Sequence, residues 1–250
     1  MISAIVNTPL SALGRLLAAL AMATASPTGG ALAAPFEDTM AQRALACTAC
    51  HGKEGRAGPD GYYPRIAGKP AGYLYNQLLN FREARRNYAL MTRMTDPLSD
   101  AYLMEIAQHF AALDLPYPAP HRARFPADVL RRGQELALKG DASRQIPACV
   151  QCHGQALTGV QPNTPGLLGL PRDYLNAQLG AWKTRQRRAH APDCMAQIAD
   201  QLTTDDVAAV SSWLATQVLP PNTKAVASLF APLPMPCGSA AAPVQQGAQK

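Results

Sequence analysis

Aromatic side chains are scarce in this chain of 250 residues, which holds two Trp, eight Tyr and five Phe. Aromatic residues usually dominate a core, so these alone would make a thin one. No alternation of apolar and polar residues marks a β-strand. The basic residues behind the net charge of +6 are scattered and not interleaved with aromatics, which argues against nucleic-acid binding. These absences predict a helical protein whose core needs another source of apolar bulk.

The N-terminus has the features of an export signal. Arg15 precedes a short apolar stretch at residues 16–25, and Ala31, Leu32 and Ala33 offer a small-residue cleavage site. The apolar stretch is short for a membrane span, although retention as an uncleaved anchor is the alternative. We therefore expect residues 1–33 to be a signal peptide and the mature protein to lie in the periplasm.

Two copies of the pentapeptide Cys-x-x-Cys-His stand about a hundred residues apart, each followed by Gly. Their defining residues are Cys47, Cys50 and His51 in the first copy and Cys149, Cys152 and His153 in the second. This pattern attaches a c-type haem, because the two thiols form thioethers with the vinyl groups and the histidine ligates the iron. A thioredoxin-like pair would need a βαβ pattern, and zinc would need further ligands nearby; neither is present. The sequence thus predicts two covalently bound haem c groups.

Two cysteines remain outside these motifs, Cys194 and Cys237. In an oxidising compartment they most simply form a disulfide.

The chain is an internal duplication with an offset near 102 residues. Residues recurring in register are Tyr73 with Tyr174, Gln77 with Gln178, Phe81 with Trp182 and Arg86 with Arg187. We predict a first domain at residues 34–118, a second at 119–218 and a tail rich in Pro and Ala at 219–250. Four prolines within residues 114–126 make the connection a stiff linker.

Each half reads as helical. Expected helices cover residues 39–46, 71–86, a segment capped by Ser99, and residues 128–139, 172–188 and 204–218. The fold is therefore predicted to be all-α, with two tandem domains related by duplication.

The second axial ligand of each iron decides the function, since an open position binds small molecules whereas methionine closes the site. After His153 only Met195 and Met235 follow, and Met195 lies just before the last predicted helix. Its partner by register is Met91. Met94 is the rival, but it aligns with an isoleucine, which favours packing.

Three histidines are alternative ligands, His109, His121 and His190. Their positions do not repeat between the halves, so we interpret them as solvent-facing or core residues.

Further residues could tune the haems. The carbonyls of Pro64 and Pro165 stand where they could accept the free N–H of His51 or His153, although ordinary loop prolines explain them equally well. The recurring glutamines, arginines and tyrosines could bond haem propionates. They are Gln77, Gln178, Arg86, Arg187, Tyr73 and Tyr174. A purely structural helix face is the alternative.

From about residue 36 to residue 218 the chain resembles the cytochrome c4 family. The resemblance rests on the paired Cys-x-x-Cys-His-Gly, on the Gly-x-Pro-x-x-Tyr-Leu run, whose first glycine in the second half stands at Gly169, and on Met91 and Met195 ahead of Leu-Ser and Leu-Thr. It implies two class I cytochrome c domains with facing propionate edges and His/Met-ligated irons. It also implies electron transport from a quinol-oxidising cytochrome bc-type complex towards a terminal oxidase. The tail and the Cys194 and Cys237 pair depart from the family pattern.

The sequence thus favours an exported dihaem electron carrier of a respiratory chain, without catalytic residues, that meets redox proteins and is at most peripherally associated with the membrane. A cytochrome subunit of a periplasmic dehydrogenase, docked through the tail, is the alternative. A dihaem peroxidase would need an open iron, and disulfide oxidoreduction would need a closer cysteine pair; both are less favoured.

Overall fold

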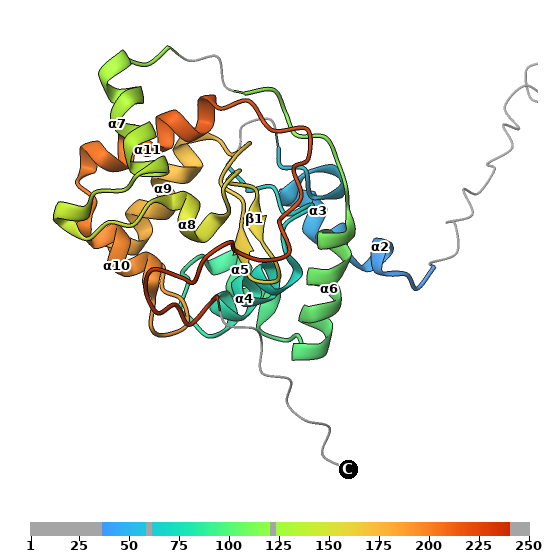
Figure 1. The fold of residues 1–250 in the computed structure, drawn as a ribbon. Helices are drawn as coiled ribbons and strands as arrows, with labels where there is room; N and C mark the ends of the chain where they lie inside the picture. Colours follow the sequence, from blue (N-terminus) through green and yellow to red (C-terminus); the bar gives the residue numbers. More distant parts are fainter. Residues whose placement is uncertain (1–36, 59–61, 121–123, 241–250) are drawn as a thin grey trace, which may run out of the picture. The chain divides into compact units, whose positions relative to one another are not determined.

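The computed structural model describes residues 37–58, 62–120 and 124–240 (Figure 1). The predicted signal peptide, residues 1–33, lies outside these ranges, as does His121. The described residues from Asp38 to residue 240 belong to one compact unit. Among the described residues, every helix is too short or too polar to span a lipid bilayer.

In the described residues the secondary structure is mainly helical, with loops, one short hairpin and isolated bridges besides, which confirms the all-α prediction. The first half contains α2 (Met40–Arg43), α3 (Leu45–His51), η1 (Lys53–Gly55), α4 (Ala71–Arg82), α5 (Ala89–Thr95) and α6 (Asp100–Ala112). The second half contains α7 (Ala127–Leu138), η2 (Ala142–Arg144), α8 (Cys149–His153), α9 (Arg172–Lys183), α10 (Cys194–Gln201) and α11 (Thr204–Thr216). Strands β1 (Gly159–Val160) and β2 (Thr164–Pro165) form the antiparallel hairpin.

Hydroxyl side chains begin several helices. The Ser99 hydroxyl accepts from the backbone N–H of Tyr102 at 3.3 Å, which confirms the predicted cap of α6. Thr39 caps α2 in the same way. The helix expected at residues 39–46 is instead divided at Ala44 into α2 and α3, so the pentapeptide has a short helix of its own.

The helices α4 and α9 end about four residues earlier than predicted. After each one the backbone enters the left-handed region, at Ala84 (φ 55°) and at Arg185 (φ 63°). This turn brings Arg86 and Arg187 into an isolated antiparallel bridge. The spacing of apolar residues contains no signal for such a turn, so the two predicted helices extend past it. The short helices α5 and α10, which carry the two candidate methionines, were also missed.

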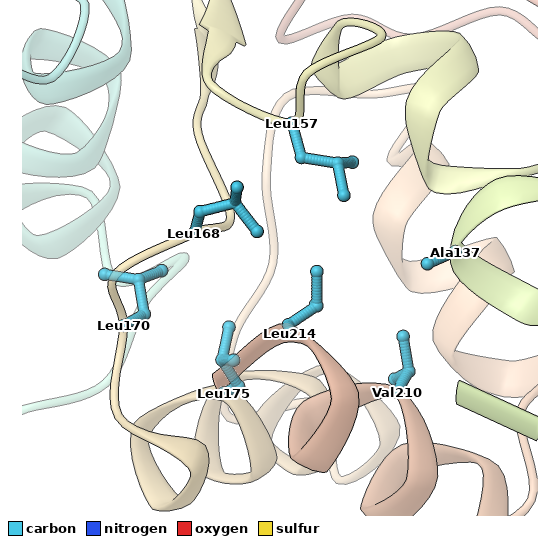
Figure 2. Close-up of a cluster of buried hydrophobic side chains, with 7 residues drawn as sticks. All are labelled: Ala137, Leu157, Leu168, Leu170, Leu175, Val210 and Leu214. Atoms are coloured by element: carbon cyan, nitrogen blue, oxygen red, sulfur yellow. The ribbon is translucent and has the colours of Figure 1, made fainter. Parts of the chain in front are cut away.

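Each half has its own apolar core. One cluster of the second half joins α9 and the loops before it to α7 and α11 (Figure 2), and consists of Ala137, Leu157, Leu168, Leu170, Leu175, Val210 and Leu214. A smaller cluster consists of Leu136, Ile146, Leu202 and Val207. The cluster of the first half consists of Ala44, Leu74, Ile106, Ala107 and Phe110. Helices α7 and α11 cross closely at Gly133, where any side chain would meet the backbone carbonyl of Ala209.

The linker and the tail are fastened to the helical body. Buried Arg65 donates to the carbonyls of Leu115 (2.6 Å) and Pro116 (3.0 Å), which holds the start of the linker. In the tail, Val226 forms a parallel bridge with Val160 of β1. The predicted domain boundary at residues 118 and 119 falls between α6 and α7.

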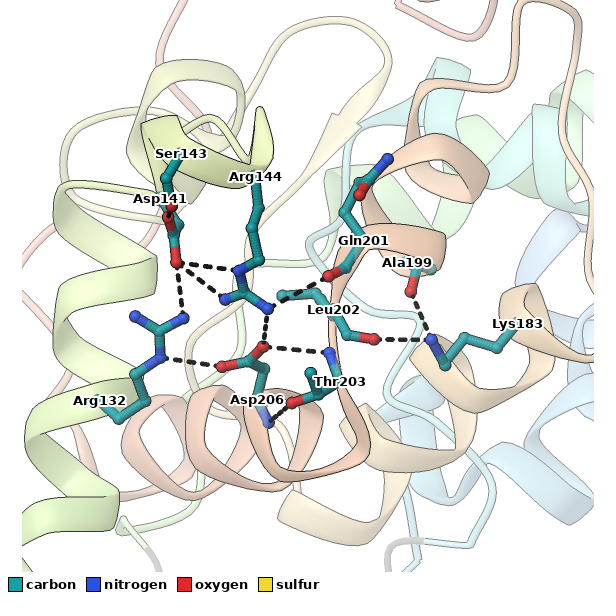
Figure 3. Close-up of polar contacts among 10 residues, drawn as sticks. All are labelled: Arg132, Asp141, Ser143, Arg144, Lys183, Ala199, Gln201, Leu202, Thr203 and Asp206. Carbon is teal, nitrogen blue, oxygen red and sulfur yellow. Dashed lines mark hydrogen bonds and ion pairs between the residues drawn. The ribbon is translucent and has the colours of Figure 1, made fainter.

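A network of two arginines and two aspartates ties the start of α11 to the middle of α7 and to η2 (Figure 3). Arg132 binds Asp141 and Asp206 at 2.9 Å each, and Arg144 binds the same carboxylates at 2.9 and 2.7 Å. Burial alone would raise the pKa of Asp206, but hydrogen bonds from Arg144, Thr203 and Arg132 lower it below its ordinary value of 3.8. The Ser143 hydroxyl and both arginines likewise lower the pKa of Asp141.

We expect Asp206→Asn to lower the free energy of unfolding by about 2–3 kcal/mol at pH 7, because it removes charge-assisted bonds from a side chain only 7% exposed. A carboxylate with a depressed folded pKa stabilises the fold above its unfolded pKa and loses that contribution as the pH falls through the folded pKa. The wild type should therefore lose stability below about pH 4 more steeply than the variant. Urea unfolding of the holoprotein at several pH values measures both effects.

Asp173→Asn is the matched control, because Asp173 is 93% exposed and pairs with Arg172 at 3.4 Å. Its effect should stay within about 0.5 kcal/mol. Equal losses in the two variants would contradict the assigned role of the network.

Candidate functional site

Each pentapeptide lies on a short helix that ends at its histidine, α3 in the first half and α8 in the second. His51 and His153 are 8% and 7% exposed. The glycine that follows each histidine has a positive φ, 74° at Gly52 and 81° at Gly154, which a side chain would strain. A side chain at Gly52 would also strike the carbonyl of Ala57. The glycine therefore lets the chain turn away directly behind the ligand histidine.

A backbone carbonyl fixes each imidazole ring. Nδ1 of His51 lies 2.8 Å from the carbonyl oxygen of Pro64, and Nδ1 of His153 lies 2.8 Å from that of Pro165. A carbonyl only accepts, so Nδ1 carries the proton and Nε2 keeps its lone pair. Burial lowers the pKa of both histidines, which favours the neutral ring that iron ligation requires.

A cavity of about 1540 Å³ adjoins the first pentapeptide and is ample for a macrocycle. It is lined by the motif residues of α3 and by Met91 and Met94 of α5. Met91 is half-buried, whereas Met94 is 45% exposed. His109 lies outside this cavity.

The second pentapeptide adjoins a narrower cavity of about 180 Å³. Its lining combines the motif residues of α8 with Met195 of α10 and Met235 of the tail. His190 is not part of it; its Nε2 lies 3.2 Å from Nη2 of Arg85. The volume is below the range usual for ligand sites, so the two halves differ in the room around the same set of donors.

Three of the four pentapeptide thiols are not activated for exchange chemistry. Burial raises the pKa of Cys47 and Cys152, and it raises that of Cys149 to about 12. Redox-active and zinc-binding cysteines need thiolates. The residues in the described ranges also contain no group of three or more His, Cys, Asp or Glu able to hold a metal ion.

Two arginines and two glutamines from the two halves bind one another crosswise. Arg86 donates to Oε1 of Gln77 (3.1 Å) and of Gln178 (2.6 Å). Arg187 donates to the same two oxygens, at 3.0 Å for Gln77 and 2.8 Å for Gln178. Residues that correspond to each other in the repeat therefore lie side by side, and each arginine binds a glutamine of both halves.

This arginine–glutamine cluster has an excess of buried positive charge. Arg187 is 5% exposed, and burial together with the neighbouring Arg86 lowers its pKa. Lys69, 6% exposed, also lines both cavities. Among the described residues, no carboxylate forms an ion pair with any of the three. Buried charges require partners, so the cluster suits anionic groups in the cavities. The repeat identifies the arginines, but Lys69 aligns with Leu170, so the repeat contains no signal for Lys69.

Comparison with known proteins gives several relatives. No protein-family model matches the chain. It is 38% identical over 204 residues to "Thiosulfate dehydrogenase electron acceptor" of Thiomonas intermedia, covering 81% of this chain and 89% of the relative. It is 31% identical over 170 residues to cytochrome c4 of Thiocapsa roseopersicina, covering 67% and 85%. The chain belongs to the cytochrome c4 family.

Solved structures agree with this assignment. Reduced recombinant cytochrome c4 from Pseudomonas stutzeri matches with a TM-score of 0.60 at 27% identity, over 71% of this chain and 96% of that one. "Thiosulfate dehydrogenase (TsdBA)" from Marichromatium purpuratum also matches with a TM-score of 0.60 at 32% identity. There the match covers 69% of this chain but only 36% of the longer TsdBA chain.

The present chain is therefore a dihaem electron carrier with two covalently bound haem c groups, which confirms the prediction from the sequence. The residues present fit these groups, because each cavity presents two cysteines and a neutral histidine with Nε2 available, and the buried cations suit propionates. Bound haem supplies reversible one-electron chemistry at iron, while the chain supplies attachment, an oriented ligand and compensating charge.

We expect the double variant Cys149→Ser/Cys152→Ser to carry one covalent haem per chain instead of two, because serine forms no thioether. Acid–acetone extraction followed by a pyridine haemochrome assay measures this content. Cys194→Ser/Cys237→Ser is the control and should keep two. Two acid-resistant haems in the first variant would contradict the assignment.

Proposed function

We propose that this cytochrome accepts electrons from a dehydrogenase that oxidises thiosulfate and passes them on, through its two haems, in the periplasm. The observation that carries the proposal is the 38% identity to the electron acceptor from Thiomonas intermedia, over 89% of that protein. A second such acceptor, from Stutzerimonas stutzeri, is 37% identical. The sequence alone favours electron transfer from a quinol-oxidising complex, with a dehydrogenase partner as the alternative. These relatives support the dehydrogenase partner over the quinol-oxidising complex.

The route between a quinol-oxidising complex and a terminal oxidase is the second candidate. Relatives named cytochrome c4 support it, at 28–31% identity. The signal peptide proposed for residues 1–33 agrees with either route, since both place the protein in the periplasm.

Met91 and Met195 are the proposed second axial ligands. Both lie in the first turn of short helices that line the cavities, Met91 on α5 and Met195 on α10, and both are half-buried. Register favours this pair, and the exposure of Met94 favours Met91 over it. Thioether ligation stabilises ferrous iron and raises the reduction potential, and it leaves no open coordination position for peroxidase chemistry.

Under this proposal, the residues around each haem site have separate roles in electron transfer. Pro64 and Pro165 hold the imidazole rings in one orientation. Arg86 and Arg187 compensate the propionates of both haems, because each arginine reaches into both halves.

Met91→Ala should lower the reduction potential of one haem and halve the near-infrared sulfur–iron absorption, because one of two thioethers is lost. Met94→Ala is the matched control, one helical turn away on α5, and should leave both haems unchanged. A redox-titrated visible and near-infrared spectrum separates these outcomes. The reverse pattern would assign the ligand to Met94.

The partner is tested by stopped-flow reduction of the oxidised cytochrome. With thiosulfate and a thiosulfate dehydrogenase, we expect reduction faster than with a quinol and a quinol-oxidising complex at the same concentration. Faster reduction by the quinol-oxidising complex would favour the second candidate and contradict the proposal. Thiosulfate without enzyme is the control and should give no reduction.

A further inference from the structure

The tail returns to the second haem site and is covalently joined there. A disulfide links Cys237 of the tail to Cys194, across 43 residues of sequence. Cys194 is the first residue of α10 and directly precedes Met195. The disulfide is therefore attached one residue from the proposed iron ligand.

Hydrogen bonds seat the same stretch of tail. The N–H of Gly238 donates to the carbonyl of Pro192 at 2.9 Å, just before α10. Any side chain at Gly238 would collide with the carbonyl of Ala191. The side-chain amide of Asn76, on α4 of the first half, lies 3.5 Å from the carbonyl of Ser239. The tail is thus packed closely against the approach to α10.

The rest of α10 is held at both ends. At its start the Asp193 carboxylate accepts from the N–H groups of Ala189 (2.7 Å) and Ala196 (3.0 Å). At its end Lys183 donates to the carbonyls of Ala199 and Leu202, at 3.0 and 2.6 Å. A helix of eight residues has little stability of its own, so these attachments determine where Met195 lies.

Among the described residues the first half has no equivalent disulfide, although Arg82 donates to the carbonyl of Leu98 at 2.9 Å as Lys183 does to that of Leu202. Leu90 occupies the place of Cys194 in the repeat and is 54% exposed. Met91 therefore lies on a helix without a covalent link, and the first haem provides an internal reference for the second.

We propose that the Cys194–Cys237 disulfide is a positioning element for the second haem, which keeps Met195 on the iron. Its reduction by a dithiol lowers the potential of that haem alone. The reaction takes two electrons and two protons: the S–S bond breaks, two thiols form, and the dithiol becomes a disulfide. The inference rests on the proposed ligation by Met195. Freed from the link, the start of α10 samples positions in which the thioether leaves the iron, and loss of sulfur ligation disfavours the ferrous state.

The test uses the holoprotein and the double variant Cys194→Ser/Cys237→Ser. We expect the near-infrared sulfur–iron band to weaken towards about half, and one of the two reduction potentials to fall, with the other unchanged. In a parallel experiment, dithiothreitol reduces the disulfide of the wild type, iodoacetamide caps the two thiols, and the haem irons are then reoxidised. This capped protein should behave like the variant. An unchanged spectrum and unchanged potentials in a folded variant with two haems would overturn the proposal.

Gly238→Ala gives a test that keeps both cysteines. The added methyl group meets Ala191 and displaces the tail, so the same potential should fall if the seating of the tail positions Met195. This variant and the capped wild type decide the matter if the double variant does not fold. A potential that stays at the wild-type value in both would again overturn the proposal.

Two methionine variants separate this inference from the ligand assignment. Met195→Ala should remove the sulfur band of the second haem, and Met235→Ala should leave it in place. If Met195→Ala has no effect, the proposed ligation is wrong and the positioning role falls with it. If Met195→Ala acts as expected but the disulfide and Gly238 variants do not, only the positioning role is wrong.

Discussion

The guanidinium groups of Arg86 and Arg187 share the side-chain oxygens of Gln77 and Gln178. Most of the arrangement of the two halves and their haem sites follows from that contact. Like charges held together away from water raise the free energy unless anions compensate them. No described carboxylate pairs with them, and we propose that the propionates of the two haems compensate this charge. The cluster joins the two halves through residues that recur in register, and under this proposal it would also orient both cofactors and link their electrostatics.

The two halves repeat each other in donors but differ in surroundings. Both present two cysteines, a histidine held by a proline carbonyl, and a methionine on a short helix. Among the described residues, only the second site has a disulfide-linked tail beside it and a narrow cavity. Its second methionine, Met235, comes from that tail, whereas Met94 of the first site lies on α5 with Met91. Two chemically similar haems in different surroundings can have different potentials, since burial and local charge tune the iron. Such a difference would give electrons a preferred direction between donor and acceptor.

The features that could be predicted from the sequence are local motifs, in which the spacing of residues dictates the chemistry. The pentapeptides required haem, the repeat predicted two helical halves, and Ser99 marked the start of α6. The ends of α4 and α9 could not be predicted, because left-handed turns at Ala84 and Arg185 leave no apolar pattern. Lys69 lacked a counterpart in the other half, and the contact of Met235 with the second site depends on the path of the tail. Tertiary contacts of this kind have no periodicity in the sequence.

The central claim is that histidine and methionine close both irons, which makes the protein a carrier of electrons and not a reactor. Exposure of the reduced wild-type protein to carbon monoxide at neutral pH tests it most directly. The account predicts an unchanged visible spectrum, because no coordination position is open in either haem. Rapid, stoichiometric formation of a carbon monoxide complex would contradict it.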